Sequence, residues 1–279
     1  MASGVSESAG PLPPRLAEAD ARGGSGSASE ARHALANWVA DVTVLRGALL
    51  VQGSFLVLVL LLAYVLYLAG DMVTSATAPG YYARQAMLAM GILGKLALVV
   101  VGAALGALDV QWGTWGTRVT AYSAVRLTAT RWGLLLVLSV AAALAALAIG
   151  EILDFAVSLN SRSLDTVGQL LVVSADVALW VSIGFAVATL TRSLAASAGG
   201  VVIYLLAEMF LESRLPQGVL ACLPNWNASV LLAHAFPVED GAIGVVLAHH
   251  GPVWSSALVC SLYGVVSALV AVLGARREL

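Results

Sequence analysis

The sequence predicts an all-α polytopic membrane protein with six transmembrane helices, and two observations carry this prediction. Hydrophobic residues make up 60% of the 279 residues and charged residues only 11%, whereas soluble domains carry about 25% charged residues. The chain also contains six apolar stretches close to the roughly 20 residues that cross about 30 Å of hydrocarbon. They are residues 48–69, 85–108, 132–150, 167–190, 194–211 and 252–274.

The composition also excludes several other classes of protein. A net charge of −2 gives no basic surface for a nucleic-acid partner. Two cysteines are too few for a disulfide scaffold or a cysteine-ligated metal site. His249 and His250 are adjacent and point in different directions on a helix, so no metal site is expected there. A single lysine among 14 basic residues is typical of a GC-rich bacterium, which predicts a bacterial cell membrane.

Two segments precede the first apolar stretch. Residues 1–30 are rich in Gly, Ser, Ala and Pro, and we expect a disordered cytoplasmic tail. Residues 31–46 instead predict an amphipathic helix at the membrane interface. Its apolar side consists of Leu35, Trp38, Val39, Val42 and Leu45, and its polar side of His33, Asn37 and Asp41. A plain cytosolic extension of the first transmembrane helix is the alternative.

Arginines in the short loops predict the orientation, because cytoplasmic loops carry an excess of basic residues. A cytoplasmic N-terminus places eight arginines inside, namely Arg32, Arg46, Arg118, Arg126, Arg131, Arg192, Arg276 and Arg277. It leaves Arg84, Arg162 and Arg214 outside. Both termini are therefore expected in the cytoplasm.

The cytoplasmic segment 109–131, between the second and third apolar stretches, contains a tandem Trp-Gly-Thr sequence. Its glycines permit a tight turn, and either threonine can cap a following helix. On that helix Arg118, Tyr122 and Arg126 share one face, since they are spaced by four residues. This face predicts a cytosolic partner, although loop arginines alone are also explained by membrane orientation.

The segment resembles the membrane subunits of type-2 ABC exporters. The residues that match the family's pattern are Asp109, Trp112, Gly113, Thr114, Trp115 and Arg126, with Arg131 where the family often has a basic residue. Asp109 replaces the more frequent Glu, and the spacing to Arg126 is about one residue longer. The similarity covers nearly the whole chain after residue 31 and extends to an outer segment, 212–251, that carries Pro216, Pro224 and Pro237.

The resemblance implies a permease with six spans, an N-terminal amphipathic helix, a cytoplasmic coupling helix and short re-entrant helices in 212–251. It implies that two ATPase subunits dock on 109–131 and bind ATP and Mg, and that a second permease subunit completes a homodimer or heterodimer. The implied activity is export of a hydrophobic or amphiphilic substrate such as a drug, peptide or lipid. Because the chain has no Gly-x-x-x-x-Gly-Lys-Ser/Thr sequence, we expect no ATPase activity and no cofactor in it.

Three charged residues fall inside apolar stretches, where an unpaired charge is expensive. Lys95 and Asp176 are predicted at equal depth, so they can form a structural ion pair, to which Ser174 and Ser182 can add hydrogen bonds. A role in a substrate or proton path, or a lysine that reaches water without contacting Asp176, are the alternatives. Glu208 is expected to face water or the protein interior, with direct substrate contact as the other interpretation.

Three other functions compete with the permease. An ion-gradient-driven secondary carrier would use Lys95 and Asp176 as coupling charges, but it predicts internal repeats that the sequence does not display. An intramembrane hydrolase lacks a Gly-x-Ser-x-Gly sequence and a histidine inside any apolar stretch. A non-catalytic assembly factor is compatible with the sequence.

Overall fold

The computed structural model describes residues 26–47, 51–56, 59, 60, 63, 80–113, 123–156, 166–236 and 251–276. All regular secondary structure in these ranges is helical. Five helices are long and apolar enough to cross a membrane: Tyr81–Gln111, Ala124–Ala156, Thr166–Thr191, Leu194–Arg214 and Val253–Ala275. The protein is therefore a helical membrane protein with several spans. Most of the predicted first span, 48–69, lies outside the described residues, so the count of six stays a prediction.

The observed helices match the other five apolar stretches but differ in length. The second span joins α3 (Tyr81–Ala89), a π-helical turn η2 (Met90–Gly94) and α4 (Lys95–Gln111). The following spans are α6 (Ala124–Ala156), α7 (Thr166–Thr191), α8 (Leu194–Leu211) and α11 (Val253–Arg276). Helix α6 exceeds the predicted 132–150 at both ends, because apolarity marks the stretch inside the membrane whereas polar residues prolong the helix beyond it.

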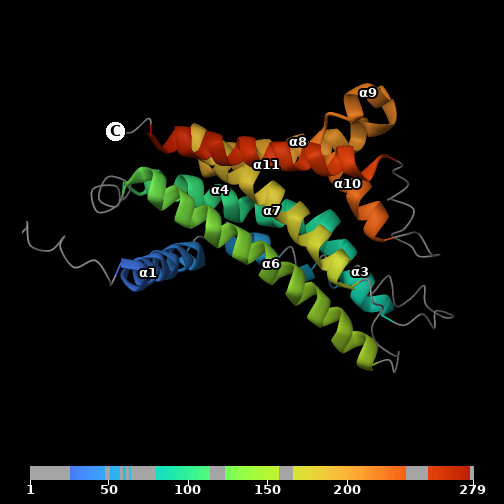
Figure 1. Ribbon diagram of the computed structural model, residues 1–279, viewed down its shortest axis with the longest axis horizontal. Coiled ribbons are helices and arrows are strands. Elements are labelled where there is room, and N and C mark those ends of the chain that lie inside the picture. The colour runs from blue at the N-terminus through green and yellow to red at the C-terminus, as the bar shows by residue number, and fades with distance from the viewer. Residues whose placement is uncertain are drawn as a thin grey trace, which may run out of the picture.

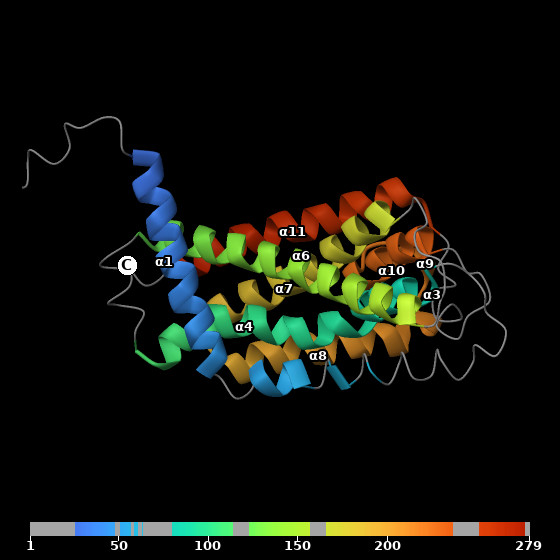
Figure 2. The ribbon, with the colours of Figure 1, turned by 90° about the horizontal axis from the view of Figure 1, so that it is seen from below.

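The spans lie side by side and leave two distinct ends (Figures 1 and 2). At one end, the α1 end, helix α1 (Gly26–Gly47) crosses the bundle steeply (Figure 2). At the other, the α10 end, lie α3 and the short helices α9 (Gln217–Leu220) and α10 (Pro224–Ala235). The start of α6 and the end of α11 lie at the α1 end.

Helix α1 differs from its prediction in two ways. It begins at Gly26, so residues 26–30 are helical where the sequence predicted a disordered tail; residues 1–25 lie outside the described ranges. Asp41, placed on the polar side, is fully buried against the bundle, whereas Leu35 and Val39 are 60% exposed. Trp38 Nε1 donates a hydrogen bond to the Thr130 carbonyl at 2.8 Å, which ties α1 to α6. The apolar residues that point away from the bundle suit an interfacial helix.

Glycines set a close seam between α4 and α7. A Cβ atom built on Gly102 would lie 2.2 Å from the Val181 carbonyl oxygen, and one on Gly184 would lie 2.7 Å from the Val99 carbonyl oxygen. Because these glycines have no side chain, the backbones of the two helices lie closer together than any larger residue at these positions would permit. Helix α11 approaches α7 at Gly274, where a Cβ would lie 3.0 Å from Thr189 Oγ1, but at Gly264 nothing lies within 4 Å.

The segment after α8 folds back onto the bundle. The chain passes through a 3-10 turn, η3 (Glu212–Arg214), and α9 before Pro224 starts α10 at a position where proline's missing N–H is tolerated. Asn227 Nδ2 donates to the carbonyls of Ala221 and Leu223 at 3.0 and 2.8 Å, which closes the turn before α10. Helix α10 then packs against α7, α8 and α11. The rest of the predicted outer segment, 237–250, lies outside the described residues.

Candidate functional site

A pair of opposite charges lies near the middle of two spans. Lys95 Nζ is 3.5 Å from Asp176 Oδ2, and both side chains are almost completely buried. Along the helix axis Lys95 is about 1.5 Å from the midpoint of Tyr81–Gln111, and Asp176 about 4 Å from that of α7, at 1.5 Å per residue. The predicted pairing of these side chains is therefore present in the structure, and both residues lie near the midpoints of their helices.

The first turn of α10 joins this pair from the α10 end. Lys95 Nζ donates a hydrogen bond to Asn225 Oδ1 at 2.7 Å, and Glu208 Oε1 of α8 accepts one from the Trp226 backbone N–H at 2.7 Å. Glu208 therefore faces the protein interior, where it satisfies a backbone donor at the start of α10. The ammonium of Lys95 also lies 6.0 Å from the centroid of the Trp180 ring. Three spans and the start of α10 thus meet at one polar cluster.

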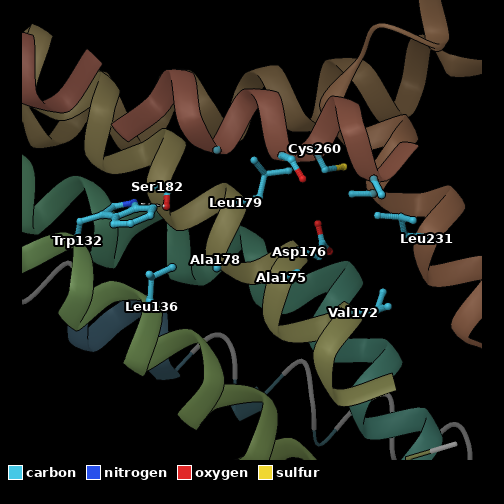
Figure 3. A pocket seen from close by; sticks show the side chains of 14 residues that line it. Trp132, Leu136, Val172, Ala175, Asp176, Ala178, Leu179, Ser182, Leu231 and Cys260 are labelled. Atoms are coloured by element: carbon cyan, nitrogen blue, oxygen red, sulfur yellow. Dashed lines mark hydrogen bonds between the residues drawn. The ribbon is translucent and has the colours of Figure 1, made fainter. Parts of the chain in front are cut away.

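A pocket of about 380 Å³ adjoins the cluster, between α6, α7, α10 and α11. Fourteen residues line it, and Asp176 is the only charged one. The carboxylate of Asp176 points across the pocket toward α11, with Cys260 on the opposite wall (Figure 3). Trp132 closes one end, where its indole Nε1 donates to Ser182 Oγ at 2.9 Å (Figure 3).

The hydrogen bonds that the sequence predicted around Asp176 are not formed. Ser182 Oγ accepts from Trp132, and Ser174 Oγ has no hydrogen-bond partner within the described residues. Neither carboxylate oxygen of Asp176 accepts a hydrogen bond from any residue that the structure describes, although the residue is only 5% exposed. Asp176 is thus a buried acceptor that faces a cavity and is held mainly by its charge attraction to Lys95.

A second buried cluster lies at the α1 end. Arg131 of α6 contacts Asp41 of α1, with Nη2 at 3.1 Å from Oδ1, and forms an ion pair with Asp109 at the end of α4. Its Nη1 also donates to the Leu105 carbonyl at 3.0 Å. One guanidinium therefore joins three helices beside the two ends of the segment 112–123. A buried arginine held by two carboxylates fits its five fixed donors.

The predicted coupling segment is described at its two ends only. Trp112 is 51% exposed after α4, and Gly113 has a φ of +69°, the left-handed conformation that glycine adopts most readily. Arg126 is exposed in the first turn of α6, where its backbone N–H donates to Ser123 Oγ at 3.3 Å. Ser123 therefore caps α6. Thr114, Trp115, Arg118 and Tyr122, with both candidate threonine caps, lie outside the described residues.

Sequence reasoning missed Asp41 and Asn225 as members of these clusters. Asp41 lies on the polar side of an amphipathic helix, where a carboxylate is expected to face water. Its partner Arg131 is ninety residues away, so no local sequence signal indicated the contact. Asn225 follows Pro224, and a polar residue at the start of a short helix gives a weak signal. Among the described residues, no group of three or more His, Cys, Asp or Glu side chains could hold a metal ion.

Comparisons of this chain with protein-family models, with curated proteins and with solved structures gave no match.

Proposed function

We propose that this chain is the permease subunit of an ATP-driven ABC transporter of type 2. Separate ATPase subunits, which bind ATP and Mg, dock on the segment 109–131, and a second permease subunit completes the complex. The proposed cargo is hydrophobic or amphiphilic, and the proposed direction is export from a bacterial cell. Support comes first from the motif residues: Asp109 lies in the last turn of α4, Trp112 and Gly113 form the turn after it, and Arg126 lies in the first turn of α6.

One observation supports the coupling role most strongly, namely the position of Arg131. It holds α1, α4 and α6 together beside the proposed docking segment. A partner that moves this segment therefore pulls on three helices at once. Helix α4 continues from Asp109 to Lys95, so the movement reaches the intramembrane charge cluster and the pocket beside it. Two sites that bias one packed bundle are the physical requirement for allosteric coupling.

Co-purification tests the proposal directly. The tagged chain is co-expressed with a candidate ATPase subunit encoded beside it, and stoichiometric recovery from detergent is measured. We expect recovery with the unchanged chain and its loss with Arg118→Glu/Arg126→Glu, which reverses the charge of the docking face. Arg214→Glu, an exposed reversal in η3 far along the chain from this segment, is the matched control and keeps the ATPase bound. Failure of several candidate ATPases to bind a well-folded chain overturns the proposal.

A secondary carrier is the other candidate, favoured by the cavity-facing carboxylate of Asp176. In that case Asp176 binds and releases a proton beside Lys95 as the coupling step, and no ATPase is needed. Proteoliposomes with an internal pH dye separate the two functions. In a proton-coupled carrier, an imposed gradient of cargo drives protons across the membrane without ATP. Under the permease proposal, the internal pH stays constant in this assay.

A further inference from the structure

We propose that the pocket between α6, α7, α10 and α11 binds an amphiphilic amine, with the ammonium group donating hydrogen bonds to Asp176 and the apolar body filling the rest of the pocket. As a statement about cargo, this inference rests on the proposed transport function. As a statement about a binding site, it depends on the pocket alone.

The lining defines the apolar part of the ligand. Apart from Asp176, the walls consist of small and aliphatic side chains with Trp132, two serines and Cys260. Ser182 is already engaged by the Trp132 indole, which leaves few polar groups for the ligand. A volume of about 380 Å³ lies at the lower end of the roughly 300–1,000 Å³ typical of small-molecule sites. The ligand is therefore compact and mainly hydrocarbon.

The charge of the cluster defines the head group. With all three side chains ionised, Lys95, Asp176 and Glu208 sum to −1, so one bound cation neutralises the cluster. Lys95 Nζ donates a hydrogen bond to Asn225 Oδ1 at 2.7 Å and lies 3.5 Å from Asp176 Oδ2. Both oxygens of Asp176 are left as buried acceptors, which a donor from a ligand would satisfy. An anionic ligand meets repulsion from the same carboxylate, and a neutral one leaves the charge of the cluster uncompensated.

A bare metal ion fits this site less well than an ammonium group. Asp176 is the single carboxylate in the lining, and the described residues contain no cluster of three metal-ligating side chains. Hard cations need several oxygen ligands at once. An ammonium on a hydrocarbon body needs only one acidic acceptor and an apolar enclosure, and this pocket has both.

The test uses the full chain alone in lipid nanodiscs and three probes with one shared hydrocarbon cage: 1-adamantylammonium, 1-adamantanol and adamantane-1-carboxylate. Binding is measured by calorimetry, with empty nanodiscs subtracted to remove partitioning into lipid. We expect the ammonium probe to bind at least tenfold more tightly than the alcohol, a ratio typical of a charge-assisted hydrogen bond. The carboxylate is expected to bind most weakly. Equal affinity for all three probes overturns the proposal.

Two variants test separately the contact of the ammonium group with Asp176 and the apolar part of the pocket. Lys95→Met/Asp176→Asn removes both members of the ion pair together, and the preference for the ammonium probe is expected to fall at least tenfold. Gly264→Leu places a side chain in the open space of the pocket wall and is expected to abolish binding of all probes. Gly200→Leu, in open space on α8 and outside the pocket lining, is the matched control.

Unchanged binding in either pocket variant overturns the proposal, since both alter the lining directly. No ATPase is present in this assay, so its failure leaves the permease proposal standing. Conversely, a failed co-purification leaves the binding result unaffected.

Discussion

Arg131 Nη2 lies 3.1 Å from Asp41 Oδ1, although ninety residues of sequence separate the two. The contact fastens the helix that crosses the α1 end of the bundle to a membrane-spanning helix. Both side chains are at most 3% exposed. Removal of one partner from such a buried pair leaves a charge without its compensation, which is strongly destabilising.

We therefore expect Arg131→Gln to lower stability by about 3–5 kcal/mol, because Asp41 and Asp109 lose their shared guanidinium. Thermal denaturation in detergent, followed by size-exclusion chromatography, measures the change. Arg126→Gln, an exposed substitution five residues earlier in α6, is the control, with an expected effect within about 0.5 kcal/mol. Equal midpoints for the two variants would contradict the structural role of Arg131.

Lys95 and Asp176 are expected to behave as one unit in a double-mutant cycle. Lys95→Met leaves the Asp176 charge in the bilayer, and Asp176→Asn leaves that of Lys95, so each single variant should yield less monodisperse protein. Lys95→Met/Asp176→Asn should recover much of the yield, with a coupling of about 0.5–3 kcal/mol. Additive losses in the double variant would show that the two charges are stabilised independently.

The seam between α4 and α7 predicts a sharp size limit at Gly102. Gly102→Ala introduces a methyl group 2.2 Å from the Val181 carbonyl oxygen, a contact that backbone atoms must move to relieve. We expect a loss of about 1–3 kcal/mol or more, measured as a lower melting temperature. Gly168→Ala, in the same helix pair but in open space, should be neutral or slightly stabilising. The reverse order of the two melting temperatures would refute the seam.

Asp154 is expected to protect two amides of α3. Its Oδ1 and Oδ2 accept from the backbone N–H groups of Tyr82 and Ala83 at 2.9 and 3.0 Å. Asp154→Ala removes both acceptors at the start of the helix, at a cost of about 1–2 kcal/mol typical of a lost cap. Hydrogen exchange should therefore accelerate in peptides that cover 81–85 while peptides from α7 stay unchanged. Slow exchange in both regions would contradict the capping role.

The sequence predicted the spans well because apolar length is a local property. The stretch 194–211 coincides with α8, and 167–190 falls one residue short of α7 at each end. The pairing of Lys95 with Asp176 followed from depth alone, since an ion inside a bilayer needs a partner. These features require only counting along one helix.

The remaining features depend on contacts between helices, and periodicity carries no information about those. Asp41 lies on a polar face, so nothing local indicates that this face turns toward the bundle. The role of Asn225 depends on how the chain after Pro216 folds back. The pocket arises from a gap between α7 and α11 at Gly264, and a glycine looks the same in sequence whether it lies in a seam or in open space.

The seam and the Gly274 contact together make the pocket mechanically asymmetric. Its α7 wall, which carries Asp176, packs against α4 through the close backbone contacts at Gly102 and Gly184. Its α11 wall is one helix thick, and the other side of that helix exposes Leu258 and Leu262. A tilt of about 10° about Gly274 displaces Cys260 by roughly 4 Å, at 1.5 Å per residue, about the width of a methyl group. A tilt of α11 by this amount would therefore change the width of the pocket between α11 and α7.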